Sequence, residues 1–166
     1  AERMRLTRTG SVSVMEDRNA IGSNMKGMEP VSALTEIMFD IKSKNTELQN
    51  KFAANGNHEG ILDQEVSGAT KNLDKIVNDS EQVFNVSVQD CITDDMTKEV
   101  SPEVTANQLE RTGNALKVWN QRIALMQTWL QTEGSYDQEL NIAGYHMLRS
   151  MVTIAHVIEE RNLTAQ

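Results

Sequence analysis

The stretch LERTGNALKVWNQRIALMQTWL, residues 109–130, carries the strongest periodicity in the chain. One series of residues recurs every seven positions and contains Leu109, Leu116, Ile123 and Leu130. A second series lies three positions after the first and contains Thr112, Trp119 and Met126. Two such series fall on one side of an α-helix, and their burial requires another helix to pack against that side. The stretch therefore predicts a long amphipathic helix.

Boundary signals on both sides of this stretch set its limits. Ser101 suits an N-cap and Pro102 suits the first turn that follows it. After the stretch, Ser135 with Gln138 three residues later forms a capping box, which predicts the start of another helix. That last helix has a wide apolar stripe, and we expect it to end at about Arg161.

Two more helices are predicted before this pair. The first covers residues 30–54, and its apolar series is Leu34, Ile41 and Leu48. The second starts near Ile61 and keeps the same period through Phe84. Residues 86–92 fit either a continued helix to about Cys91 or a short extended segment, because β-branched residues gather there. We favour the continued helix.

Asn45 is a polar interruption in the apolar series of the first predicted helix, where Met38 and Phe52 hold the equivalent positions. A buried asparagine in such a series lowers stability but fixes the register of the packed helices. The alternative is that Asn45 lies at a solvated edge of the helix. Both readings are open at this point.

The composition agrees with an all-α fold. Hydrophobic residues make up 39% of the 166 residues, aromatic residues only 4%, and there are two prolines. Such a core rests on aliphatic side chains and methionine, which favours helices packed on helices. We predict an antiparallel four-helix bundle of long amphipathic helices over residues 30–166, with an irregular N-terminal arm over residues 1–29.

The predicted arm contains scattered glycines and serines that break any helical period. It is either a fraying tail or a docking arm that becomes ordered on a neighbouring surface. The docking reading is motivated by apolar residues that a solubility tail would lack. The candidate anchors are Leu6, Val12, Val14, Met15, Ile21 and Met25.

Trp119 and Trp129 differ in their position relative to the heptad series. Trp119 falls within it, so we expect it in the core. Trp129 falls beside it and is flanked by Gln127 and Gln131. An exposed tryptophan rimmed by polar residues is typical of a protein–protein contact, so Trp129 is predicted to be an interaction residue.

Charge and hydropathy argue against two classes of partner. The net charge is −8, and a surface of that sign repels nucleic-acid phosphates. No run of about eighteen apolar residues is present, so no membrane span is expected. The single cysteine, Cys91, excludes an intramolecular disulfide.

The residues that usually carry chemistry lack the required spacing. His146 and His156 are ten residues apart on one predicted helix, a rise of about 15 Å, which is too far for one metal ion. Cys91 follows Asp90, and an acidic neighbour disfavours a reactive thiolate. We therefore expect no catalytic residue, no metal site, no cofactor and no small-molecule substrate.

These features favour a non-enzymatic structural or assembly subunit that self-associates or docks in a larger complex, such as a filament, a virion or a secretion apparatus. The alternative is an adaptor or chaperone-like bundle that binds a partner helix. An enzyme is the least favoured class, because no pair of groups with plausible reach is present.

Overall fold

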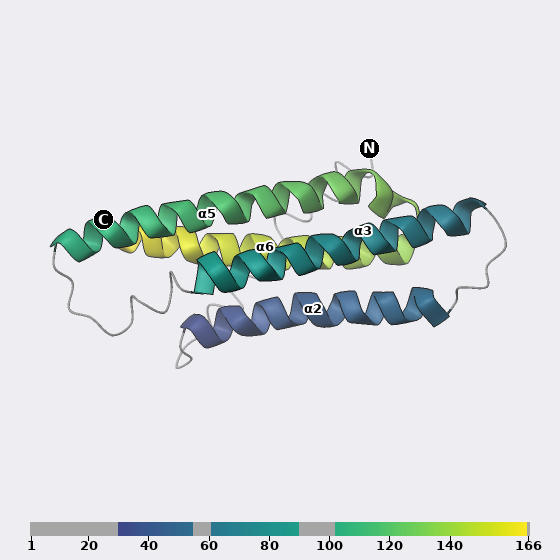
Figure 1. The fold of residues 1–166 in the computed structure, drawn as a ribbon, viewed down its shortest axis with the longest axis horizontal. Helices are drawn as coiled ribbons and strands as arrows, with labels where there is room; N and C mark the ends of the chain where they lie inside the picture. The colour runs from purple at the N-terminus through teal and green to yellow at the C-terminus, as the bar shows by residue number, and fades with distance from the viewer. Residues whose placement is uncertain (1–29, 55–60, 90–101, 166) are drawn as a thin grey trace.

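The computed structural model describes residues 30–54, 61–89 and 102–165. Over these ranges the chain forms four α-helices, α2 (Pro30–Ala54), α3 (Ile61–Val83), α5 (Pro102–Gln131) and α6 (Gln138–Ala165) (Figure 1). Two short helical turns complete the described chain, the π-helical turn η1 (Phe84–Val88) and the 3₁₀ turn η3 (Glu133–Ser135). The prediction of an all-α helical bundle is confirmed.

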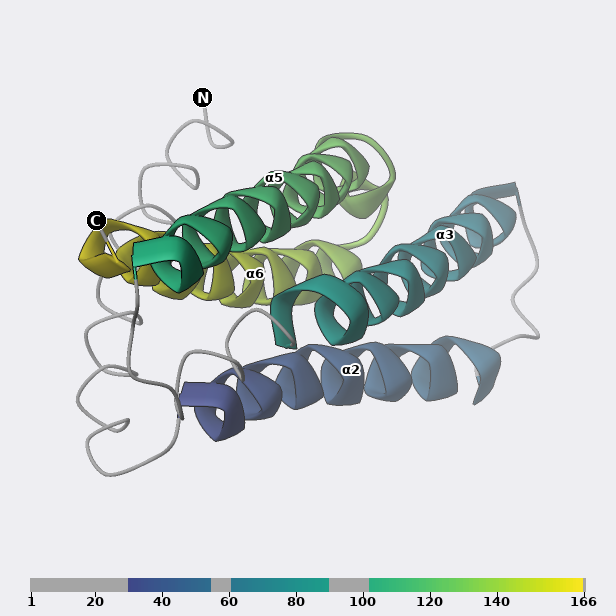
Figure 2. The ribbon, with the colours of Figure 1, turned by 60° about the vertical axis from the view of Figure 1, so that its left-hand side comes forward.

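Each long helix packs against two others, in the cyclic order α2, α3, α5, α6 (Figure 2). The cross-contacts of α2 and α6 give their relative direction. Asp40 meets His146, whereas Lys51, further along α2, meets Glu139, which comes earlier in α6. The two helices therefore run in opposite directions.

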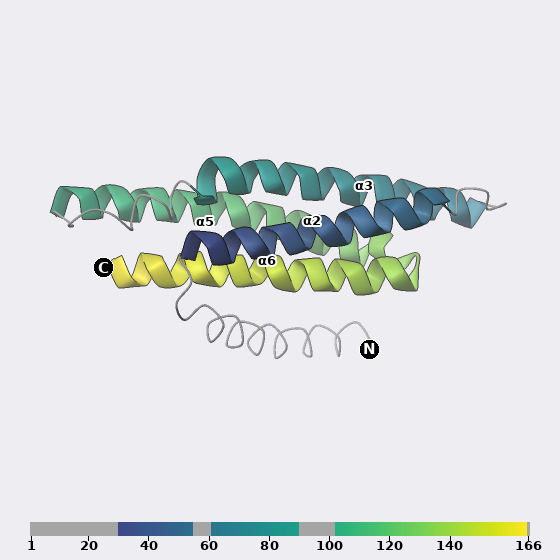
Figure 3. The ribbon, with the colours of Figure 1, turned by 90° about the horizontal axis from the view of Figure 1, so that it is seen from below.

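The same reasoning applies to α3 and α5. Phe84, at the end of α3, contacts Trp119, whereas Ala69, earlier in α3, accepts a hydrogen bond from Trp129, later in α5. Seen from below, α5 and α6 also lie side by side and advance towards opposite ends of the bundle (Figure 3). Neighbouring helices thus alternate in direction around the bundle.

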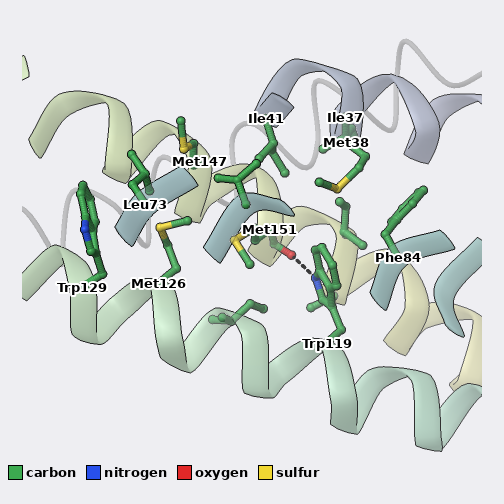
Figure 4. Close-up of a cluster of buried hydrophobic side chains, with 14 of the residues drawn as sticks. Ile37, Met38, Ile41, Leu73, Phe84, Trp119, Met126, Trp129, Met147 and Met151 are labelled. Carbon is green, nitrogen blue, oxygen red and sulfur yellow. Dashed lines mark hydrogen bonds between the residues drawn. The ribbon is translucent and has the colours of Figure 1, made fainter. Parts of the chain in front are cut away.

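The core lies between the four helices and is built from the predicted aliphatic and methionine side chains (Figure 4). Its largest fully buried members are Trp119, Phe84, Leu34, Ile41, Leu73, Met126, Leu140, Met147, Met151, Ile154 and Ile158. The two heptad series of residues 109–130 face this core, although Leu109 and Leu116 are only half-buried.

The apolar side of α3 departs from the predicted heptad pattern. Val77 and Phe84 are buried, whereas Ile76 and Val83, which the pattern placed inside, are only half-buried. The helix continues beyond Val83, as predicted, but it widens into a π turn in which the Gln89 N–H donates to the Phe84 carbonyl. The wider turn keeps Phe84 and Val88 both in the core. Cys91 lies outside the described residues.

The N-cap of α6 is Asp137 and not the predicted Ser135. The Asp137 Oδ1 accepts hydrogen bonds from the N–H groups of Glu139 at 2.8 Å and Leu140 at 3.2 Å. Ser135 instead ends the preceding turn, where its Oγ donates to the Thr132 carbonyl. The 3₁₀ turn shifts the helix start by two residues, so the capping box does not form.

Replacement of Asp137 by alanine is expected to lower the free energy of unfolding by about 1 kcal/mol, because two N–H groups at the start of α6 lose their acceptor. Urea denaturation followed by circular dichroism measures this change. Ser135→Ala is the matched control and should have the smaller effect. A larger loss in Ser135→Ala than in Asp137→Ala would contradict the assignment of the cap.

Candidate interaction surface

The six candidate anchors of the N-terminal arm, Leu6, Val12, Val14, Met15, Ile21 and Met25, lie outside the described residues. The predicted cap Ser101 also lies outside them. The candidate surface is therefore built from the four described helices.

Trp129 is buried, which contradicts its predicted place on an exposed flank. Only 2% of the residue is exposed, and its indole N–H donates to the carbonyl of Ala69 on α3 at 3.0 Å. Its ring lies against Gly144 of α6, where the missing side chain leaves space for it. The tryptophan therefore fills the core between α3, α5 and α6, and it offers no surface to a second molecule.

Trp119 lies in the core, as predicted. It is fully buried, and its indole N–H donates to the Met151 carbonyl on α6 at 2.8 Å (Figure 4). The ring of Phe84 meets it edge-on, with 6.2 Å between the ring centroids. The two tryptophans of α5 thus donate hydrogen bonds to the backbones of two different neighbouring helices. These bonds fix the positions of α3 and α6 along α5.

Asn45 is buried, with 4% of the residue exposed, which decides between the two readings of this position. Its Nδ2 donates to Asp74 Oδ1 at 2.8 Å, and its Oδ1 accepts from Gln49 Nε2 at 3.1 Å. Gln49 Nε2 also lies 2.8 Å from the Thr70 carbonyl oxygen. This network joins α2 to α3 and satisfies the buried amide, which is how a polar residue specifies register.

Polar pairs also join α2 to α6. His146 Nε2 lies 2.7 Å from Asp40 Oδ2, and both side chains are partly exposed. Lys51 forms an ion pair with Glu139 nearer the start of α6. Among the described residues, no three His, Cys, Asp or Glu side chains gather into a possible metal site.

The contact between α3 and α5, called here the α3–α5 seam, differs from the polar α2–α3 and α2–α6 contacts. On α3, Asp74 and Glu81 are seven residues apart and bond to α2. Ile76 and Val83 are also seven residues apart and lie on the opposite flank of α3. Because the other neighbour of α3 is α5, this flank faces α5. Both residues are half-buried. The α3 side of the seam therefore carries two aliphatic side chains, and the half-buried Asp79 lies between them on the same flank.

On the α5 side of the seam, Arg122 lies seven residues before Trp129, which reaches α3, so Arg122 lies on the same flank. Its Nε is buried and has no hydrogen-bond partner. Leu125 lies between Arg122 and Trp129 in the sequence and farther from the core, and it is 46% exposed. We define the α3–α5 seam by Ile76, Val83, Arg122 and Leu125.

The sequence contained only a weak signal for this seam. Val118 and Leu125 are seven residues apart and belong to neither heptad series, and apolar residues outside both series indicate an additional apolar flank. Arg122 gave no signal, because a single arginine on a helix is ordinarily solvated. Its partial burial depends on how α3 packs against α5.

No protein-family model, no curated protein and no solved structure matches the chain. Within the described residues, no helix has the length and apolar character needed to cross a membrane.

Proposed function

We propose that this chain is a non-enzymatic structural or assembly subunit, which self-associates or docks in a larger complex through its helices and its N-terminal arm. A filament, a virion or a secretion apparatus is the kind of complex that it suits. The observation that supports this function most is the α3–α5 seam, which combines an exposed leucine, half-buried aliphatic side chains and a partly buried arginine.

The chemistry of the seam indicates what it would bind. Ile76, Val83 and Leu125 offer apolar surface whose burial against another helix is favourable. Arg122 is half-buried, so the accessible part of its guanidinium could donate hydrogen bonds to a carboxylate of a partner. A second copy of this chain has such groups, since it contains 24 acidic residues and carries a net charge of −8.

The alternative function is an adaptor that binds a helix of another protein. A row of aliphatic residues between two antiparallel helices also suits an amphipathic partner helix with an acidic residue opposite Arg122. The two functions differ in whether the purified chain associates with itself.

Leu125→Glu is expected to weaken self-association by about thirtyfold, since it removes about 2 kcal/mol of apolar burial. The new carboxylate also lies three residues from Arg122, where it would compete with a carboxylate of the partner. Light scattering across about a hundredfold range of concentration measures the effect, because association follows mass action. The matched control is Ile142→Glu, which changes an exposed residue, 59% exposed, on α6 away from the seam.

Equal losses of self-association in Leu125→Glu and Ile142→Glu would exclude the seam as the contact between copies. An unmodified chain that stays monomeric, yet retains a single helical partner in a pull-down that Leu125→Glu abolishes, would favour the adaptor. Removal of residues 1–28 is expected to reduce the rise in particle size with concentration, because the arm is proposed to take part in the contacts.

A further inference from the structure

Two triplets of residues on the α3–α5 seam match each other. On α3, the flank that faces α5 carries an acidic residue between two aliphatic ones, namely Ile76, Asp79 and Val83. On α5, the flank that faces α3 carries a basic residue between two aliphatic ones, namely Val118, Arg122 and Leu125. Each triplet is apolar at its ends, and the charges at the two centres have opposite signs.

Contacts between α3 and α5 show which residues of the two flanks lie level with each other. Trp129 donates to the Ala69 carbonyl, and the ring of Trp119 meets the ring of Phe84. Residue 124, midway between the two tryptophans, is therefore about level with residues 76 and 77, midway between Ala69 and Phe84. Because the helices are antiparallel, the triplets match residue by residue, Asp79 with Arg122, Val83 with Val118, and Ile76 with Leu125.

The two central charges have no charged partner within the molecule. Asp79 and Arg122 are both half-buried, so each side chain keeps some exposed surface. Within the part of the chain that the structure describes, the ion pairs join other side chains, and the Arg122 Nε has no hydrogen-bond acceptor. Each charge can therefore pair with a group of opposite sign on a second molecule.

We infer that a second copy of this chain packs on the α3–α5 seam about a two-fold axis that runs along the seam, parallel to the helices. A surface that carries both members of a matching pair is complementary to itself, which is what a two-fold contact between identical chains requires. The inference rests on the proposed self-association and adds the orientation of the two copies and the residues that meet.

The charges select this orientation. A two-fold axis that crosses the helices would place α3 on α3 and α5 on α5, so that Asp79 faces Asp79 and Arg122 faces Arg122. Like charges opposed in this way disfavour association. The axis along the seam instead places α3 of each copy on α5 of the other copy, so that Asp79 and Arg122 pair twice.

The same orientation brings aliphatic residues together. A rotation about an axis along the seam keeps each residue at its level, so Ile76 faces Leu125 of the second copy and Val83 faces Val118 of the second copy. Leu125 is 46% exposed in the single molecule, and the contact buries it. The helices that meet across the contact are antiparallel, as neighbours within the bundle are.

Charge reversal at either centre should weaken self-association by at least about tenfold, because each single variant opposes two pairs of like charges. The variants are Asp79→Arg and Arg122→Glu, and sedimentation at about 0.15 M salt measures their association. Glu36→Arg is the matched control, since it makes the same change of charge at an exposed position on α2 and should leave association unchanged. Circular dichroism checks that each variant stays helical.

A mixture of the two variants tests the pairing between copies. When Asp79→Arg chains meet Arg122→Glu chains, one contact joins Arg122 to Asp79 and the other joins the two introduced charges, which have opposite signs. The equimolar mixture should therefore associate to within about threefold of the unmodified chain, although each variant alone does not. A single chain that carries both reversals should also recover.

Disulfide formation tests the orientation with smaller changes, which also serve if a charge variant loses its helicity. In a Cys91→Ser background, Leu125→Cys chains mixed with Ile76→Cys chains should form a mixed disulfide under mild oxidation, because the two positions face each other across the contact. Val83→Cys is the matched control for Ile76→Cys. It lies seven residues further along α3, a rise of about 10 Å, and should react with Leu125→Cys at least about tenfold more slowly.

Three results would overturn the inference. A mixture that fails to associate, while Leu125→Glu still weakens the association of the unmodified chain, would exclude the two-fold contact and leave the proposed self-association standing. Recovery only in the chain with both reversals would place the pair of Asp79 and Arg122 within one molecule. An unmodified chain that stays monomeric at every concentration would contradict the proposed self-association and the contact that rests on it.

Discussion

Trp119→Ala is expected to lower the free energy of unfolding by about 3–5 kcal/mol. The indole is fully buried at the centre of the core, donates to the Met151 carbonyl on α6, and meets the ring of Phe84 on the continuation of α3. Its removal opens a cavity between three helices that the surrounding side chains only partly refill.

Chemical denaturation followed by circular dichroism measures the loss of stability in Trp119→Ala. Asn120→Ala is the matched control, since the next residue on α5 is exposed and should change stability by less than about 0.5 kcal/mol. A similar small change in Trp119→Ala would show that the indole is not packed as described.

Gly144→Ala is expected to lower the free energy of unfolding by about 1–3 kcal/mol, although alanine has the higher helix propensity. A Cβ at this position of α6 would lie 2.7 Å from Cζ3 of Trp129 and 2.8 Å from Cδ1 of Leu130. The indole is also held by its hydrogen bond to Ala69, so it has little freedom to move away.

Gly113→Ala, in α5, is the matched control and should have the opposite sign. A Cβ there meets no atom within 4 Å. Helix propensity then dominates, and the free energy of unfolding should rise by about 0.5–1 kcal/mol. Thermal melting of the two variants compares them directly. A rise in stability in Gly144→Ala would contradict the close packing of Trp129 on α6.

The sequence predicts the helices well because their signals are local. Pro30 begins α2 and Pro102 begins α5 in the structure, as each proline's fit to a first helical turn indicates. The seven-residue spacing likewise places Trp119 and Met126 in the core. These signals need no knowledge of the partner helix.

The failures concern positions whose environment depends on another helix. Trp129 lies beside the heptad series, yet it is buried because Gly144, fifteen residues later, leaves room for its ring. Ser135 and Gln138 form a valid capping pattern, but the 3₁₀ turn gives the role to Asp137. Burial of Arg122 likewise depends on the packing of α3 against α5. Spacing along one helix does not contain this information.

Sedimentation of the unmodified chain tests the proposed assembly role most directly. The monomer has a mass of 18.6 kDa. If the α3–α5 seam binds a second copy, the weight-average mass should rise with concentration, and Leu125→Glu should return it towards the monomer while Ile142→Glu does not. A mass that stays at the monomer value at every concentration, in all three proteins, would contradict self-association through the seam.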